Sequence, residues 1–92
     1  MKEAENQLYR ATDEIMFYLW DPIGVRDIPA ARDEYQSYLP KLFKMIVADA
    51  KDHEIAEYLF KLETSLMGMS GNKDQALKAA RTLINAKEFY LE

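Results

Sequence analysis

Apolar residues recur at steps of three and four along most of the chain, and this spacing constrains the fold more than any other feature of the sequence. Residues with this spacing share one face of an α-helix. The alternation of apolar and polar residues that marks β-strands never extends beyond a few positions. No internal repeat, low-complexity tract or linker interrupts the 92 residues. The sequence therefore predicts an all-α fold, a compact four-helix bundle in which residues 1–92 form a single helical domain.

The first predicted helix covers residues 3–20 and ends at a turn-forming segment. Asp21, Pro22 and Gly24 match the first, second and fourth positions of a type I turn, which stops the helix. The buried face of this helix is predicted to consist of Leu8, Ala11, Thr12, Ile15 and Leu19.

The second predicted helix starts near Pro29, whose missing N–H group costs nothing in a first turn. Pro40 falls inside this helix and removes the hydrogen bond to the Gln36 carbonyl, so we predict a kink or a break there. We expect this helix to pack antiparallel to the first. Its buried face is predicted to consist of Ala31, Tyr35, Leu39, Leu42 and Ile46.

Capping residues define the last two helices. Asp52 is a suitable N-cap for the third helix, which Gly68 ends. Asn72 and Gln75 have the spacing of a capping box at the start of the fourth helix. The predicted inward residues are Ile55, Leu59, Leu62 and Leu66 in the third helix, and Ala76, Leu77, Ala80, Leu83, Ile84 and Leu91 in the fourth.

Composition narrows the classes of function. The absence of cysteine excludes disulfides, thiolate metal ligands and cysteine nucleophiles, and it favours a reducing compartment. No apolar run approaches the ~20 residues that span a bilayer. Residues 1–40 hold eight acidic and four basic residues, a net charge of −4, and this charge repels phosphate groups. We therefore expect a cytoplasmic protein, with a monomer favoured, that binds neither nucleic acid nor membrane and whose natural partner is a basic protein.

Phe17 does not fit the helical pattern. At about 100° per residue it lies opposite the predicted buried face, beside Asp13 and Glu14. One interpretation is that the following loop folds back over Phe17, or that Phe17 is a tolerated exposed residue. The other is that Phe17 inserts into a protein partner, with the acidic residues as its polar rim.

Glu63 is the second misfit, because it projects into a wide apolar arc of the third helix. A carboxylate there should be partly buried and therefore hydrogen-bonded. Arg26, Arg32, a tyrosine hydroxyl or the indole N–H of Trp20 could provide the donor. We expect Glu63 to fix the loop that follows Trp20, in preference to a catalytic role.

Residues for catalysis or metal binding are sparse. His53 is the only histidine, and Glu57 at i+4 makes a common exposed helix pair with it. A metal site needs three or four ligands. His53 and Glu63 lie ten residues apart on one helix and face different directions. The sequence therefore predicts no cofactor, no metal and no enzyme activity.

Two sequence clusters together resemble a known family. They are Trp20-Asp21-Pro22-Ile23-Gly24-Val25 and Asp33-Glu34-Tyr35-x-x-Tyr38-Leu39-Pro40, followed by Glu63 and Met67-Gly68. Their order is similar to that in a family of small bacterial helical proteins of unknown function. The resemblance implies a compact four-helix fold, no assigned catalytic activity and a cytoplasmic location. By class, such acidic proteins also resemble the immunity partners of contact-dependent or polymorphic toxins, which bind a toxin domain and block it.

The sequence favours a protein-binding module, most directly an immunity protein that neutralises a basic toxin domain. A regulatory or adaptor protein with another cellular partner is the alternative. The candidate partner-binding residues are Asp13, Glu14, Phe17, Asp21, Asp27, Asp33 and Glu34. The residues expected to have structural roles in the motif are Trp20, Pro22, Gly24, Tyr35, Tyr38 and Glu63.

Overall fold

The computed structural model describes residues 2–21, 24, 35–66, 68 and 70–91. This part of the chain contains helices and no strand, so the all-α prediction is confirmed. Its four α-helices are α1 (Glu3–Glu14), α2 (Leu39–Val47), α3 (Asp52–Lys61) and α4 (Lys73–Leu91). Three short helical segments of other types extend them: the π-helices η1 (Ile15–Trp20) and η4 (Leu62–Leu66), and the 3-10 helix η3 (Gln36–Tyr38).

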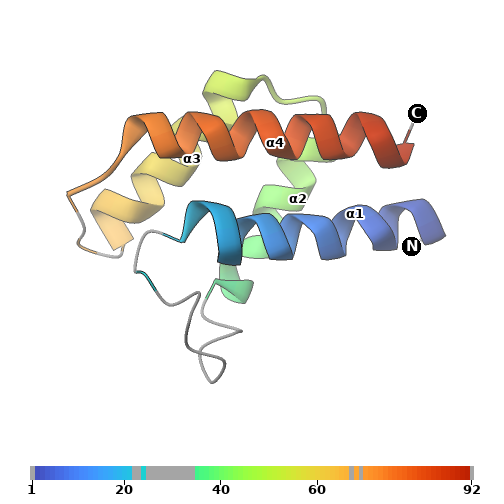
Figure 1. Ribbon diagram of the computed structural model, residues 1–92, viewed down its shortest axis with the longest axis horizontal. Helices are drawn as coiled ribbons and strands as arrows, with labels where there is room; N and C mark the ends of the chain where they lie inside the picture. Colours follow the sequence, from blue (N-terminus) through green and yellow to red (C-terminus); the bar gives the residue numbers. More distant parts are fainter. Residues whose placement is uncertain (1, 22–23, 25–34, 67, 69, 92) are drawn as a thin grey trace.

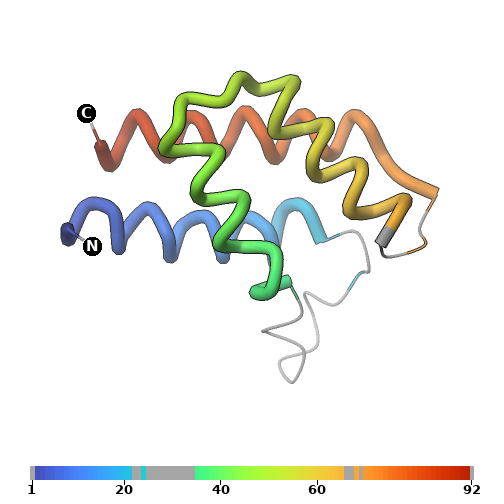
Figure 2. Tube along the Cα trace, turned by 180° about the vertical axis from the view of Figure 1, so that it is seen from behind, coloured from blue at the N-terminus to red at the C-terminus, as the bar shows by residue number. Residues whose placement is uncertain are grey.

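The helices form two layers. In one layer α1 and α4 lie side by side and run antiparallel, so that both chain ends lie at the same end of the fold (Figure 1). In the other layer α2 crosses α1 and α4, and α3 runs beside α4 (Figure 2). The expected antiparallel packing of the first two helices is therefore wrong for the described residues. The 9 residues of α2 rise only about 14 Å, which is too short to follow α1 and η1 along their length.

The core contains most of the residues that the helical spacing selects. These buried residues are Leu8, Thr12, Tyr35, Leu39, Leu42, Ile46, Ile55, Leu59, Leu62, Ala76, Ala80 and Leu83. Ala31, Pro29 and the side chain of Leu66 lie outside what the structure describes. Ile15 and Leu19 are only half-buried, whereas Met16, Phe17 and Trp20 are fully buried in their place.

Of the interpretations left open for Phe17, the exposed anchor and the tolerated exposed residue are wrong, because its side chain is only 2% exposed. Its ring lies 6.4 Å from that of Tyr35 and 4.9 Å from that of Tyr18, measured between centroids. The end of the first helix is thus covered on two faces, by α4 on one and by Tyr35 on the other. A second covered face cannot be read from the spacing of a single helix.

The π-helical turn at η1 explains why Trp20 joins the core. The Asp21 N–H donates to the Met16 carbonyl at 3.0 Å, an i→i+5 bond in place of the α-helical i→i+4 bond. The wider turn places Trp20 on the same buried side of the helix as Leu8 and Thr12. Trp20 is 2% exposed as a result.

Pro40 marks a break in the second helix, as predicted. The 3-10 segment η3 ends at Tyr38, and α2 begins at Leu39 with Pro40 in its first turn. In a continuous α-helix the Gln36 carbonyl would accept an N–H from residue 40, which proline lacks. Here the Gln36 carbonyl accepts the Leu39 N–H instead. Proline is tolerated in a first turn because its N–H has no intrahelical acceptor there.

The capping residues are confirmed for one helix and wrong for the other. Asn72 caps α4, since its Oδ1 accepts the Gln75 N–H at 3.0 Å. Asp52 is the first residue of α3 and not its N-cap, which is Lys51. The Lys51 N–H donates to Glu54 Oε1 at 2.8 Å, so the Glu54 side chain provides an acceptor for the backbone N–H of the N-cap residue.

Gly71 is required by the connection between η4 and α4. Its φ is +88°, and a Cβ there would lie 2.5 Å from the Phe60 ring and 2.9 Å from Thr64 Cγ2. We expect Gly71→Ala to lower the free energy of unfolding by about 1–3 kcal/mol, because strain and overlap act together. Chemical denaturation measures this change. Gly24→Ala, where no atom lies within 4 Å, is the comparison, and an equal loss in both variants would contradict a role for the overlap.

Candidate functional site

A buried polar network joins the end of η1 to η4 and to the start of α4. The Trp20 indole N–H donates to Glu63 Oε1 at 2.6 Å, and the Asn72 N–H donates to Glu63 Oε2 at 2.9 Å. The Gln75 amide donates to the Leu19 carbonyl. We call Leu19, Trp20, Glu63, Asn72 and Gln75 the Trp20–Glu63 network. Each carboxylate oxygen of Glu63 thus has a donor on a different element.

The Trp20–Glu63 network replaces half of the predicted capping box. In a capping box the N3 side chain accepts the N–H of the cap residue. Here Gln75 turns to η1, and Glu63 accepts the Asn72 N–H instead. The fourth helix is therefore capped jointly by its own Asn72 and by a carboxylate from η4.

The burial predicted for Glu63 is confirmed. Of the hydrogen-bond donors predicted for its carboxylate, the structure shows the indole N–H of Trp20. Glu63 is 2% exposed, and both of its oxygens are occupied by N–H donors from the chain. Among the described residues it links Trp20 to the start of α4. Most of the loop after Trp20, which we predict Glu63 to fix, lies outside the described residues. Arg26 and Arg32, the other possible donors, lie outside the described residues.

Of the remaining residues of the predicted motif, Tyr35 packs directly against Trp20. The Tyr35 ring packs 5.3 Å from the Trp20 ring between centroids, and its hydroxyl donates to Asp21 Oδ1 at 2.8 Å. The Gly24 N–H donates to the Asp21 carbonyl at 3.2 Å, the i→i+3 bond expected of the turn. Tyr38 is half-buried, and Pro22 lies outside the described residues. Asp21 therefore has a structural contact where we predicted a partner-binding role.

The predicted partner-binding residues do not form one surface in the described part of the chain. Glu14 is exposed on α1, and Asp13 is half-buried. Phe17 is in the core and cannot serve as an exposed anchor. Asp27, Asp33 and Glu34 lie outside the described residues.

An exposed aromatic residue that we did not predict lies on α4. Phe89 is 78% exposed, and its ring packs edge-on against Tyr90 with centroids 4.9 Å apart. Tyr90 lines a shallow pocket of about 230 Å³ together with α1 residues. These are Gln7, Arg10, Ala11 and Glu14. The sequence did carry a signal, because Phe89 falls outside the apolar arc predicted for the fourth helix.

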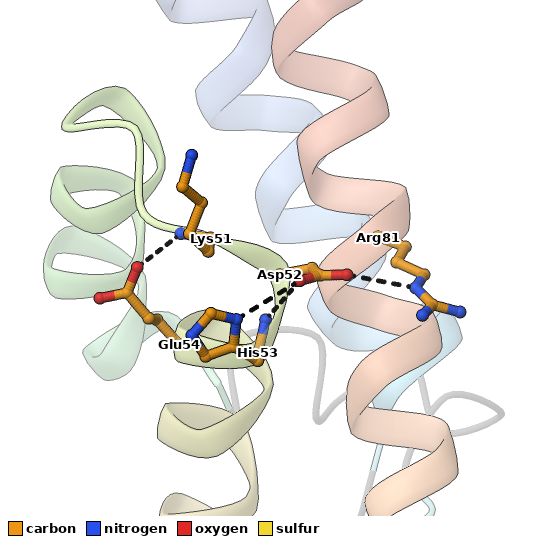
Figure 3. A network of polar contacts seen from close by, with 5 residues as sticks. All are labelled: Lys51, Asp52, His53, Glu54 and Arg81. Carbon is orange, nitrogen blue, oxygen red and sulfur yellow. Dashed lines mark hydrogen bonds and ion pairs between the residues drawn. The ribbon is translucent and has the colours of Figure 1, made fainter.

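Charged residues at the start of α3 are paired with one another and with α4 (Figure 3). Asp52 accepts the His53 backbone N–H at 2.7 Å and the Arg81 Nε–H at 3.3 Å. These two hydrogen bonds hold the pKa of Asp52 below its ordinary value. Asp49 and Lys87 form a second ion pair. A groove of about 730 Å³ is lined by these residues together with Asp52 and Arg81. Its lining holds three acidic and three basic side chains in all, so it has no excess charge that would select a ligand.

The described residues contain neither a group of metal ligands nor a membrane-spanning helix. Within the described residues, no three His, Asp or Glu side chains are grouped so that they could hold a metal ion. None of the described helices has the length and apolar character needed to cross a membrane.

The resemblance of the Trp20–Val25 and Asp33–Pro40 clusters to a bacterial family stays a prediction. Comparison with protein-family models, with curated proteins and with solved structures found no match.

Proposed function

We propose that this protein is a cytoplasmic protein-binding module that docks a basic protein on the outer side of α1 and α4. The observation that carries the proposal is Phe89, a large aromatic side chain that is 78% exposed on α4 and adjoins the ring of Tyr90. These two rings offer apolar area that a partner protein can bury. Aromatic residues are enriched among the side chains that dominate binding energy at interfaces.

The charge of the neighbouring helix supports a basic partner. In α1 the acidic residues Glu3, Glu5, Asp13 and Glu14 outnumber the single basic residue Arg10. Glu14 and Arg10 line the same shallow pocket as Tyr90, so the aromatic ring adjoins charged groups of both signs there, and the excess of acidic residues belongs to α1 as a whole. Acidic groups around an aromatic contact increase the association rate with a positively charged partner.

The partner class that we favour is a basic toxin domain, which this protein would neutralise by covering its active or substrate-binding surface. The support is the acidic first half of the chain, together with the resemblance in class to immunity proteins. Affinity purification from the source cell followed by mass spectrometry identifies the partner. Recovery of a basic toxin domain, with its activity inhibited by the purified protein, is the expected result. Recovery of a partner that keeps its activity in the complex would favour an adaptor and contradict neutralisation.

Phe89→Ala is expected to accelerate dissociation from the isolated partner, with a loss of about 2 kcal/mol in binding free energy. The association rate should change little, since Phe89 carries no charge. Surface plasmon resonance at two ionic strengths measures both rates. Added salt should lower the association rate of the unmodified protein and of Phe89→Ala alike, because the substitution changes no charge.

Val47→Ala is the matched control, because Val47 is an exposed apolar residue on α2 in the other layer. It should leave both rates unchanged, and circular dichroism should show both variants folded. Unchanged dissociation of Phe89→Ala, or an equal change in Val47→Ala, would contradict docking on α1 and α4.

A further inference from the structure

A second pocket, separate from the residues of α1 and α4, lies where the start of α2 meets the end of α3 and η4. Its volume is about 330 Å³, and the elements that build it belong to the other layer of the fold (Figure 2). Pockets that bind small molecules start at about this volume. The lining residues are Tyr38, Lys41, Tyr58, Lys61, Leu62 and Ser65.

The polar groups of this pocket are all able to donate hydrogen bonds, and none of the residues that line it is acidic. Lys41 and Lys61 are exposed, and neither forms an ion pair with a carboxylate of the described residues. Two cationic groups that have no carboxylate partner in the described part of the chain, on a protein of net charge −4, favour an anionic ligand.

The inner wall of the pocket is aromatic and apolar. Leu62 is buried at its base, and Lys41 Nζ lies 5.2 Å from the centroid of the Tyr58 ring. Burial and the nearby Tyr38 raise the pKa of Tyr58 above its ordinary value. The Tyr58 hydroxyl therefore stays protonated near neutral pH and is available as a donor.

We infer that this pocket binds a small aromatic phosphate monoester. The ring of the ligand would pack on Tyr58 and Leu62, and its phosphate would lie between Lys41 and Lys61. Lysine binds phosphate as a point charge, and the pocket has no arginine fork that would hold a planar carboxylate by two parallel hydrogen bonds. A phosphate monoester carries a charge of about −1.5 to −2 near pH 7, which two ammonium groups neutralise. This inference goes beyond the proposed function, because it uses other elements and requires no protein partner.

Titration of the isotope-labelled protein with phenyl phosphate tests the site by nuclear magnetic resonance. Saturable shifts are expected for the backbone amides of Lys41, Tyr58 and Ser65. The double variant Lys41→Gln, Lys61→Gln should weaken binding at least about tenfold. The double variant Lys44→Gln, Lys78→Gln changes the net charge equally at exposed positions outside the pocket, and it should bind within about twofold of the unmodified protein.

Two other probes identify which part of the ligand is recognised. Inorganic phosphate lacks the ring, and benzoate replaces phosphate by a carboxylate. Both should bind at least about fivefold more weakly than phenyl phosphate. Absence of saturable shifts up to about 10 mM phenyl phosphate, or an equal loss in both double variants, would overturn the site. Equal binding of benzoate would overturn the assignment to phosphate, and equal binding of inorganic phosphate would overturn the requirement for a ring.

Discussion

Trp20→Ala is expected to lower the free energy of unfolding by about 3–5 kcal/mol, the range for truncation of a buried large aromatic residue. The variant loses the ring contact with Tyr35 and leaves Glu63 Oε1 buried without its donor. Domains of this size have only about 5–15 kcal/mol in total, so a large fraction of the stability would disappear. Chemical denaturation followed by circular dichroism measures the change, since the variant lacks the only tryptophan.

Trp20→Phe separates the two contributions of this residue. Phenylalanine keeps most of the aromatic volume but has no N–H group, so the hydrogen bond to Glu63 is lost. We expect a loss of about 1–3 kcal/mol for an unsatisfied buried carboxylate oxygen together with the smaller ring. A change below about 1 kcal/mol for Trp20→Ala would contradict its place in the core.

Glu63→Ala should destabilise the protein by about 3–5 kcal/mol, because two N–H donors on different elements lose their acceptor at once and a cavity remains. Glu63→Gln retains one carbonyl oxygen and is expected to cost less, about 1–3 kcal/mol. Denaturation followed by the fluorescence of Trp20 reports on both variants, since its indole is in direct contact with Glu63.

Glu57→Ala is the matched control for Glu63, because it removes an exposed carboxylate from the preceding part of the same helical segment. Its effect should stay within about 0.5 kcal/mol. The losses in Trp20→Phe and Glu63→Ala should not add in the double variant, since both remove the same hydrogen bond. Full additivity would show that the Trp20–Glu63 bond contributes nothing to stability.

The buried faces of the helices could be predicted from the sequence because the three- and four-residue spacing of apolar residues determines them. Leu8, Leu42, Ile55 and Leu83 follow the three- and four-residue spacing, and all are buried. The burial of Glu63 could be predicted for the same reason, since the helical spacing places this carboxylate within an apolar arc. Its second donor, the Asn72 N–H, could not, because a backbone group carries no sequence signal and the contact depends on how η4 meets α4.

The candidate surface was harder to predict because exposure depends on what covers each helix. Phe17 and Phe89 both depart from the arc of their own helix, yet one is buried and the other exposed. Among the described residues, Tyr35 lies against Phe17 from another part of the chain, and α4 packs on the same helical segment. A pattern within one helix therefore selects the residues that need an explanation, and only the tertiary contacts decide between core and surface.

The two π-helical turns have a consequence for the order in which the fold assembles. Trp20 is the last residue of η1, and Glu63 lies within η4, so both partners of the buried hydrogen bond belong to wide turns. Wide turns are rare in isolated helices, where i→i+4 bonding is preferred. An unpaired segment of residues 3–20 would accordingly wind as a regular α-helix. We therefore expect the register shift to form when the indole docks on the carboxylate, as a late step of folding after the helices themselves have formed.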